Sequence, residues 1–329
     1  MTPRFSIIVP LYNKADYVRK ALESILTQSY TNYEVVIIDD ESTDNSLSIV
    51  NDFVKTVESG KWKVESQPNS GVAAARNNGV AKSKGEFVCF LDADDWWEPT
   101  WLEEIDRMIA EYPDAGIYAS NYIYYKPGKT HVALNLERGY INYSEAYLQS
   151  GSMPVTSITT CMPRKVFDEM RGFPVGIKLG EDFLLWAKTA LHYKVAFCEK
   201  PLAYYNNDVP ASLRATRNLH APEHHMLFNL ASLENEIANL SLVHSLTPSL
   251  VTSWKLLLDK LRVSGLMDYW LSDEYHDVAA AELAKVDWSK QPKSAKAQYE
   301  KPTWYLKAKR CFMKAGSYYK QKLIRLKYK

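Results

Sequence analysis

The chain has 329 residues, of which 46% are hydrophobic and 24% are charged, a composition ordinary for one or two globular domains. Its 40 basic and 39 acidic residues give a formal net charge of +1, so we expect no nucleic-acid partner. Four widely separated cysteines without a CxxC pair argue against a disulfide framework or a zinc site and favour a reducing compartment. We expect neither a signal peptide nor a membrane-spanning helix, because no apolar run is long enough.

Short apolar runs alternate with amphipathic segments in the first part of the chain. Strands are expected at residues 5–10, 34–38, 62–65, 87–91 and 115–122. Amphipathic helices are expected near residues 17–25, 47–57 and 101–112, and an alanine-rich helix begins within residues 69–79. The apolar runs lack polar alternation, which indicates strands buried on both faces. Their alternation with helices predicts an α/β fold with a mostly parallel sheet and flanking helices.

Carboxylates gather where the strand at 87–91 ends. Asp92, Asp94 and Asp95 follow it within four positions. Ligands of open α/β sheets bind at the carboxyl ends of the strands, and crowded acids repel one another unless a cation lies among them. Oxygen ligands suit Mg²⁺ or Mn²⁺, which is often held by one or two carboxylates plus substrate phosphates. The alternative is an acidic turn in which Asp94 or Asp95 caps the next helix, near Pro99.

A second acidic pair, Asp39 and Asp40, ends the strand at 34–38. Because parallel strands end at one edge of a sheet, both clusters should open on the same side. One cluster can then hydrogen-bond a base or ribose while the other holds a metal-bound diphosphate. The first strand is not followed by a GxGxxG fingerprint, and the chain has no GxxxxGK[ST] loop. Neither a dinucleotide dehydrogenase nor a P-loop protein is therefore supported.

The order and spacing of several short motifs resemble glycosyltransferase family 2, whose members have the Rossmann-like GT-A fold. The matching segments are residues 6–14, 25–30, 36–44, 69–79 and 90–95. The resemblance extends over roughly residues 4–210. It departs from the family at Glu41, where glycine is usual, and this change should alter only a turn. The resemblance implies an inverting enzyme that depends on a sugar nucleotide.

The resemblance also implies a role for each matching position. Asp92 and Asp94 would hold the metal, with Asp94 the more direct ligand. Asp40, together with Asp39, would bind the uracil edge. The other positions implied to contact the nucleotide sugar are Pro10, Tyr12, Asn13, Gly71, Arg76, Asp92 and Ala93.

Simpler interpretations of these residues stay open. Tyr12 could pack within its own loop, and Arg76 could pair with an acid on a helix surface. Asn13 and Gly71 are both typical of turns, so that their geometry alone would explain them.

Two more acids, Glu181 and Asp182, precede an apolar run with a helical pattern. Taken by itself, this pattern is a helix start at which carboxylates favour the positive end of the dipole. The resemblance instead implies the acidic pair of inverting members, in which Asp182 is the general base and Glu181 lies beside it. A helix dipole lowers the pKa of an acid and burial under an acceptor raises it, and the sequence does not decide between them.

The region after residue 112 holds two weaker signals. Tyrosines are frequent there, which suits either an acceptor groove for sugar faces or a plain β-structured core. The tyrosines in question are Tyr122, Tyr124, Tyr125, Tyr140, Tyr143 and Tyr147. His220, His224 and His225 would have metal-ligand spacing on a helix, although a solvated helix face is the better interpretation.

We expect three domains along the chain. Residues 1–212 would form the GT-A domain, with the nucleotide-sugar half at about 1–112 and the acceptor half at about 113–212. Residues 213–292 have a helical pattern and would form an appendage. Residues 293–329 would form a basic amphipathic tail.

The tail carries most of the charge asymmetry of the chain. Residues 293–329 contain twelve basic residues and a single acidic one, Glu300, interleaved with aromatic and aliphatic residues. This composition predicts an interfacial helix on an anionic membrane surface. The protein would then be cytoplasmic and peripheral on the inner face of the cytoplasmic membrane. The alternative is a helix that packs its apolar side on the catalytic domain.

The function that we expect is transfer of a sugar from a UDP-sugar to a glycan or a lipid-linked saccharide, assisted by Mn²⁺ or Mg²⁺, in surface polysaccharide biosynthesis. Two alternatives are a nucleotidyltransferase and a non-catalytic sugar-nucleotide-binding protein on the same fold. A nucleotidyltransferase should have a glycine-rich, lysine-bearing loop after its first strand, where this chain has Leu11-Tyr12-Asn13-Lys14. Whether copies of the chain form a homo-oligomer is left open.

Overall fold

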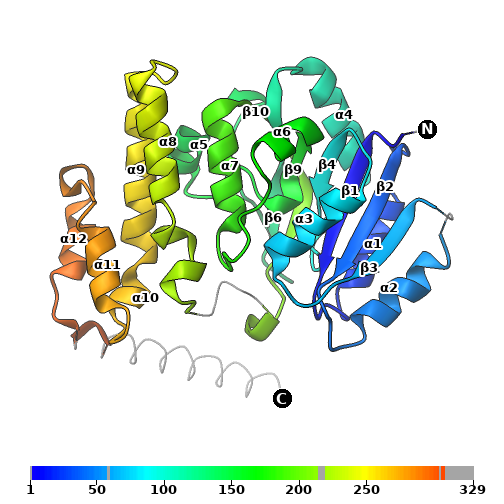
Figure 1. Ribbon diagram of the computed structural model, residues 1–329, viewed down its shortest axis with the longest axis horizontal. Helices are drawn as coiled ribbons and strands as arrows, with labels where there is room; N and C mark the ends of the chain where they lie inside the picture. Colours follow the sequence, from blue (N-terminus) through cyan, green and yellow to red (C-terminus); the bar gives the residue numbers. More distant parts are fainter. Residues whose placement is uncertain (1, 58–59, 214–218, 304, 308–329) are drawn as a thin grey trace. The chain divides into compact units, whose positions relative to one another are not determined.

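The structure is a computed structural model that describes residues 2–57, 60–213, 219–303 and 305–307. The chain forms two compact units, Met1–Trp254 and Lys255–Lys329. The first unit contains a large sheet that gathers most of the strands of the described residues (Figure 1). The domain boundaries expected at residues 212 and 292 stay predictions.

The strands of this sheet lie where apolar runs occur in the sequence. Their bounds are β1 (Phe5–Leu11), β2 (Tyr33–Asp39), β3 (Trp62–Ser66), β4 (Phe87–Phe90), β5 (Trp96–Trp97), β6 (Ala115–Tyr125), β7 (His131–Val132), β8 (Gly139–Ile141), β9 (Thr160–Pro163) and β10 (Lys194–Asn206). Every residue of β1, β2 and β4 is buried, as expected for strands covered on both faces. The sequence-based positions of the first four strands agree with these bounds to within one residue.

The helices of the first unit alternate with the strands. They are α1 (Val18–Leu26), α2 (Ser46–Val54), α3 (Val72–Lys82), α4 (Trp101–Glu111), α5 (Tyr143–Ser150), α6 (Arg164–Glu169), α7 (Glu181–His192) and α8 (Ala231–Leu242). Short 3-10 turns are η1 (Ser157–Thr159), η2 (Ala211–Leu213), η4 (Pro222–His224) and η5 (Met226–Phe228). Helix α4 begins after Thr100, so neither Asp94 nor Asp95 caps it, and that alternative is wrong.

The strand order is β3-β2-β1-β4-β9-β6-β10-β5, with β7 beside β6 and β8 beside β10. The long ladders, β1 with β2 and β6 with β10, are parallel, whereas the short strand β9 runs antiparallel between β4 and β6. The predicted α/β fold with a mostly parallel sheet is confirmed. Because β1, β2 and β4 are parallel neighbours, their carboxyl ends meet at one edge.

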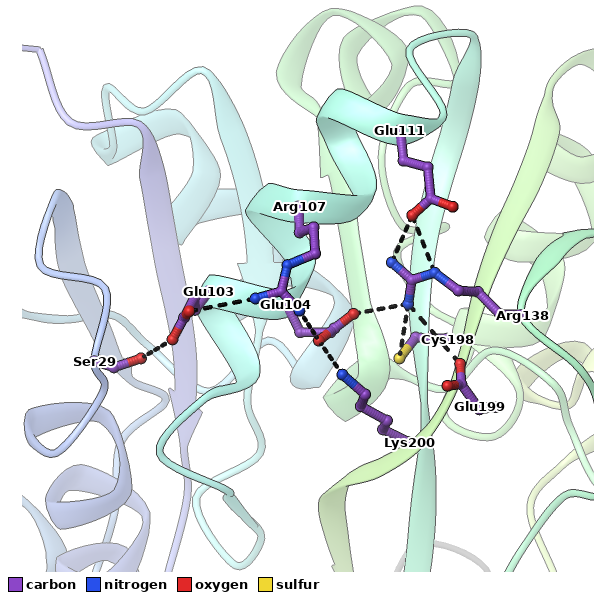
Figure 2. A network of polar contacts seen from close by, with 9 residues as sticks. All are labelled: Ser29, Glu103, Glu104, Arg107, Glu111, Arg138, Cys198, Glu199 and Lys200. Carbon is purple, nitrogen blue, oxygen red and sulfur yellow. Dashed lines mark hydrogen bonds and ion pairs between the residues drawn. The ribbon is translucent and has the colours of Figure 1, made fainter.

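A buried carboxylate ties α4 to the far part of the sheet (Figure 2). Glu104 is 4% exposed and accepts hydrogen bonds from Arg138 at 2.7 Å and from Lys200, on β10, at 2.7 Å. Arg107 pairs with the same carboxylate at 3.0 Å. Arg138 also contacts Glu111 at 2.7 Å, so it links the segment before β8 to the end of α4. One acid thus holds three separate segments together.

Two of the six tyrosines of the tyrosine-rich region are core residues. Tyr122 and Tyr143 are 1% and 2% exposed, and Tyr143 stacks on Trp254 with ring centroids 5.7 Å apart. Tyr140, by contrast, is 44% exposed. The sheet core thus accounts for Tyr122 and helix packing accounts for Tyr143, and an acceptor role for the others stays a prediction.

The second unit is helical over its described residues. It contains the end of α9 (Pro248–Gly265), then α10 (Met267–Trp270), α11 (His276–Leu283), η6 (Trp288–Lys290) and α12 (Lys293–Tyr299). Arg262 is 1% exposed and pairs with Glu282 at 3.0 Å, which joins α9 to α11. The membrane tail was predicted for residues 293–329, and its part beyond residue 307 lies outside the described residues. None of the described helices combines the length and the hydropathy that a bilayer crossing needs.

Candidate active site

The acidic clusters lie together at the edge formed by the ends of β1, β2 and β4. Leu11, the last residue of β1, is in register with Asp39, and the amide of Leu91, just after β4, donates to the carbonyl of Ile8 at 3.0 Å. Asp40 and Asp92 therefore follow β2 and β4, which flank β1 as parallel strands and end on the same side. The predicted convergence of the two clusters follows directly from the register of the sheet.

Asp94 has a cationic neighbour in this structure. The Lys14 Nζ lies 2.6 Å from Asp94 Oδ2, and both side chains are more than four-fifths buried. Burial raises the pKa of Asp94, and the charge of Asp92 adds to that effect, against the opposing influence of Lys14. Asp95 is 3% exposed, and its carboxylate accepts a hydrogen bond from the Asn206 amide at 2.7 Å. Burial, together with the charges of Asp94 and Asp92, raises the pKa of Asp95 well above its usual range.

Arg76 joins this edge to the acidic pair Glu181 and Asp182. It lies on α3 and is 3% exposed, so it is not the surface residue of the simpler interpretation. Its Nη2 is 2.6 Å from Asp92 Oδ1, and its Nη1 is 2.8 Å from Glu181 Oε1. Burial by itself lowers the pKa of Arg76, but the Asp92 and Glu181 carboxylates raise it by more. The net shift is upward, so the guanidinium stays charged. Its plane also lies over the Phe173 ring, 5.1 Å from the centroid.

Glu181 and Asp182 form the first turn of α7, as the sequence predicts. Gly180 precedes them with a φ of 83°, a conformation that favours glycine, and its Cα faces the side chain of Met226. Asp182 Oδ1 accepts a hydrogen bond from the Phe183 amide at 2.7 Å. Burial, and secondly the charge of Glu181, raises the pKa of Asp182 to about 7. Burial and the charge of Glu181 thus outweigh the opposing effects of Arg76 and of the Phe183 amide on the pKa of Asp182.

The turn that carries these acids is held by the segment 224–226. The amide of Lys178 donates to the carbonyl of His224 at 2.7 Å, and the amide of Met226 donates to the carbonyl of Leu179 at 3.0 Å. His225 is 9% exposed, and burial lowers its pKa to about 4. The expectation of a solvated histidine helix is therefore wrong, because two short 3-10 turns pack this segment against residues 178–179.

Asp39 and Asp40 are both buried, and their carboxylates accept hydrogen bonds from the surrounding loops. Asp40 accepts hydrogen bonds from the amides of Ser70 and Gly71, both at 2.9 Å, and from the side chain of Gln67 at 2.7 Å. Asp39 accepts one from the Ser42 amide at 3.3 Å. Asp40 thus shapes the loop that enters α3, and its contact with a uracil edge stays a prediction.

The remaining predicted positions surround the same edge. Pro10 is buried within β1 and Ala93 is 2% exposed, whereas Tyr12 is 46% exposed and presents its ring to solvent. Asn13 has a φ of 50°, and its Oδ1 accepts hydrogen bonds from the Thr43 and Asp44 amides. Gly71 has a φ of 87° at the start of α3. The turn roles of Asn13 and Gly71 are thus visible, and a nucleoside contact for each stays a prediction.

The donor set fits a hard divalent cation completed by a substrate. Asp92 and Asp94 both offer carboxylate oxygens at the end of β4, and burial raises the pKa of Asp94. Within the described residues, no group of three or more His, Cys, Asp or Glu side chains is arranged to hold a metal by itself. A cation at this edge would need further ligands, and substrate phosphates are a common source of them.

One residue of the site and one contact within it were not predicted from the sequence. Lys14 was predicted only as the end of the loop after the first strand, and its ion pair with Asp94 was not predicted. A lone lysine in a loop beside a predicted acidic edge is a signal from which this pairing could have been inferred. The position of Glu181 was predicted, but its contact with Arg76, 105 residues away, was not. Pairings of that separation leave no trace in periodicity or spacing.

The sheet and its flanking helices match the GT-A fold of solved glycosyltransferases. The crystal structure of S. aureus TarS 1-349 in complex with UDP-GlcNAc aligns with a TM-score of 0.72 over 90% of this chain and 83% of that chain, at 21% identity. The mannosyltransferase PcManGT from Pyrobaculum calidifontis, in complex with GDP-Man and Mn2+, gives a TM-score of 0.53 over 91% and 79% of the two chains, also at 21% identity. At such identities the likeness establishes the fold.

The sequence comparison defines the family. Residues 6–171 match the profile of glycosyl transferase family 2, and the chain belongs to that family. Glycosyltransferase GlyA of Streptococcus pneumoniae is 34% identical over 215 residues, which are 61% of this chain and 30% of GlyA. A proposed teichuronic acid biosynthesis glycosyltransferase, TuaG of Bacillus subtilis, is 38% identical over 109 residues, 33% of this chain and 43% of TuaG. The chain thus spans well under half the length of these relatives.

Proposed function

We propose that this protein transfers a sugar from a UDP-sugar to a hydroxyl of a glycan or a lipid-linked saccharide, with inversion at the anomeric carbon. One observation carries the proposal: Arg76 contacts Asp92 at 2.6 Å and Glu181 at 2.8 Å. It thereby brings the strand-end acids and the helix-borne acids, far apart in the sequence, into one site. Family membership supports the same activity.

Asp182 is the group that we assign to the proton. With a pKa of about 7 it accepts a proton more readily than an ordinary carboxylate does, and it remains substantially ionised at neutral pH. It would take the proton of the acceptor hydroxyl while that oxygen attacks the anomeric carbon from the face opposite the departing UDP. Glu181, bound to Arg76, would keep the turn in place and not itself exchange protons.

Asp92 and Asp94 would hold Mn²⁺ or Mg²⁺ in the presence of donor. When bound, such a cation supplies a Lewis acid that stabilises charge on the departing diphosphate. Tyr12, exposed beside this edge, would lie against the nucleoside. UDP is preferred over GDP as the nucleotide because of the family resemblance, and the TarS complex with UDP-GlcNAc agrees with this choice.

Asp94→Ala tests the metal assignment. We expect calorimetric titration of UDP in the presence of Mn²⁺ to show binding to the unmodified protein and none, or at least a tenfold loss, for the variant. The fold should be unaffected, because Asp94 lies at a strand end and not within β4. Asp52→Ala, at an exposed site on α2, is the control that should bind UDP normally. Equal metal-dependent binding by the Asp94 variant would overturn the assignment.

The name of one relative suggests a class of acceptor. TuaG is named for teichuronic acid biosynthesis, so a cell-surface polysaccharide is the acceptor class that we propose. A lipid-linked acceptor would agree with a protein held at the inner membrane face by the basic tail at residues 293–329.

A further inference from the structure

The ion pair between Lys14 and Asp94 occupies the point at which the proposed metal site begins. Lys14 Nζ is 2.6 Å from Asp94 Oδ2, and the two side chains are only 15% and 18% exposed. The same ammonium donates to the carbonyl of Leu213 at 3.1 Å. The carboxylate of Asp94, the predicted metal ligand, is therefore already paired with the Lys14 ammonium of the same chain.

The backbone of Lys14 is anchored independently of its side chain. Its amide donates to Ser46 Oγ at 2.7 Å. The preceding residue, Asn13, accepts the Thr43 amide at 2.8 Å, which locks the loop after β1 onto the loop before α2. Beyond this anchor the lysine side chain is a flexible four-carbon stem with a compact charge. The ammonium can consequently change partners without any movement of the loop.

A divalent cation and the Lys14 ammonium cannot share the Asp94 carboxylate. They carry charges of the same sign, and at adjacent positions in a poorly solvated site the repulsion is strong. The nearby acids offer little alternative, because Asp92 pairs with Arg76 at 2.6 Å and Asp95 is bound to the Asn206 amide. A displaced Lys14 needs a new anion, and the donor brings one next to the metal.

The charge balance of the reaction indicates which anion this is. The diphosphate of a sugar nucleotide has two negative charges and gains roughly one more as the sugar departs, whereas the cation supplies two positive charges. The cation therefore leaves an excess of negative charge around the departing diphosphate, and the Asp92 and Asp94 carboxylates add to it. Lys14 supplies one positive charge from within reach of the Asp94 carboxylate.

We propose that Lys14 takes the place of the metal at Asp94 when no donor is bound, and that it moves to the donor diphosphate when the metal binds. This proposal rests on the proposed function. It has a distinctive consequence, since one residue then opposes metal binding and favours nucleotide binding. A lysine that merely stabilises the fold would not produce opposite effects on the two ligands.

Isothermal titration calorimetry of Lys14→Met provides the test. Titration with MnCl₂ in the absence of nucleotide should show affinity about tenfold higher than in the unmodified protein, because no ammonium has to be displaced. Titration with UDP at saturating Mn²⁺ should show affinity about tenfold lower, because the diphosphate has lost a cation. Lys14→Arg keeps the charge and should remain close to the unmodified protein in both titrations.

Lys20→Met is the matched control. Lys20 is an exposed lysine on α1, and its Nζ lies 3.0 Å from the Trp96 ring centroid instead of on an acid. Removal of its charge should change neither affinity by more than about twofold. If UDP affinity fell equally in Lys14→Met and Lys20→Met, the loss would come from the lower net positive charge of the protein and not from a contact of Lys14. That result would overturn the proposal.

The remaining outcomes are also decisive. Unchanged or weaker Mn²⁺ binding by Lys14→Met would show that Lys14 does not compete with the metal, and unchanged UDP binding would show that it does not reach the diphosphate. If the unmodified protein binds neither Mn²⁺ nor UDP, the proposed function itself fails. Should Lys14→Met not fold, as judged by its thermal unfolding, Lys14→Gln in the same two titrations decides the matter.

Discussion

Arg76 is the residue at which the two acidic pairs of the site meet. Three carboxylates raise its pKa against the effect of burial, and it contacts two of them directly. Its Nε is buried without a hydrogen-bond partner among the described residues, so all of its pairing runs through Nη1 and Nη2. The site geometry therefore depends on a guanidinium, whose fork reaches both acids at once, and a lysine could not replace it.

Loss of Arg76 should be costly. Arg76→Met leaves Asp92 and Glu181 without their counter-ion, so we expect the free energy of unfolding to fall by about 3–5 kcal/mol in urea titrations. Arg107→Met is the comparison, because Arg107 is 55% exposed and its loss should cost less than about 1 kcal/mol. Similar values for the two variants would show that the buried bridge does not organise the site.

Asp182 makes a prediction about rate and pH. Asp182→Asn is nearly isosteric, so UDP affinity should survive while turnover falls by about two to four orders of magnitude. The base works in its deprotonated form, and its pKa is about 7. The turnover of the unmodified protein should therefore fall as the pH drops below 7 and level off above it. This acid limb should vanish in the variant.

Glu181→Gln is the informative counterpart of that experiment. It should affect stability and donor affinity more than the pH profile, because Glu181 is paired with Arg76 and not directed at an acceptor. If Glu181→Gln proves crippling and Asp182→Asn mild, with the acid limb intact, the base has been assigned to the wrong carboxylate.

At the scale of elements, Glu104 holds α4 to β10 and to the segment before β8. Burial alone would raise the pKa of Glu104, but hydrogen bonds from Lys200 and Arg138 lower it below its ordinary value. A lowered folded-state pKa means stabilisation that is present above the ordinary value and lost as the pH falls through the folded value. This carboxylate should thus contribute to stability at neutral pH and not in strong acid.

Glu104→Gln should accordingly reduce the free energy of unfolding by about 2–3 kcal/mol at pH 7, with a much smaller difference well below pH 4. Glu103→Gln, whose side chain is 49% exposed and pairs with Arg107, is the neighbouring control and should change stability by less than about 1 kcal/mol. A pH-independent loss in Glu104→Gln would indicate a packing defect and not a lost charge network.

At the scale of the whole molecule, the composition of the basic tail leads to a prediction that does not depend on the active site. Each basic residue near an anionic surface contributes on the order of 1 kcal/mol before screening, so even half of the twelve would retain the protein on a membrane. In liposome sedimentation, the full chain should pellet with anionic vesicles at low salt and be released at high salt. A chain that ends at Pro292 should stay in the supernatant.

Equal sedimentation of the two proteins would remove the membrane assignment. The tail would then be a structural segment, as in the alternative prediction of a helix that packs its apolar side on the catalytic domain. Neutral vesicles serve as the control for the electrostatic origin, because neither protein should pellet with them.

The predictable part of this molecule is the part encoded locally. Runs such as 34–38 and 87–91 are apolar throughout, so their burial in a parallel sheet follows from composition. The position of Asp92 and Asp40 at one edge then follows from the rule that parallel strands end together. The start of α7 at Glu181 was also visible, because two acids precede an apolar helical pattern.

The unpredictable part depends on contacts between distant segments. The antiparallel placement of β9 between β4 and β6 has no local signature, because a strand of four residues fits either direction. The Arg76–Glu181 and Lys14–Asp94 pairs join segments 105 and 80 residues apart. The buried state of His225 likewise depends on its packing against residues 178–179, and a pattern of histidines alone favoured a solvated helix.

The central claim is that a metal-dependent donor site and a general base act together in sugar transfer. The most direct measurement is UDP release from a panel of UDP-sugars, with Mn²⁺ present or chelated, by the unmodified protein, Asp94→Ala and Asp182→Asn. We expect at least one UDP-sugar to yield UDP in a reaction that requires the metal, is abolished in Asp94→Ala and is slowed by about two orders of magnitude or more in Asp182→Asn. Release that is independent of the metal and of both acids, or none from any UDP-sugar with a glycan acceptor present, would contradict the account.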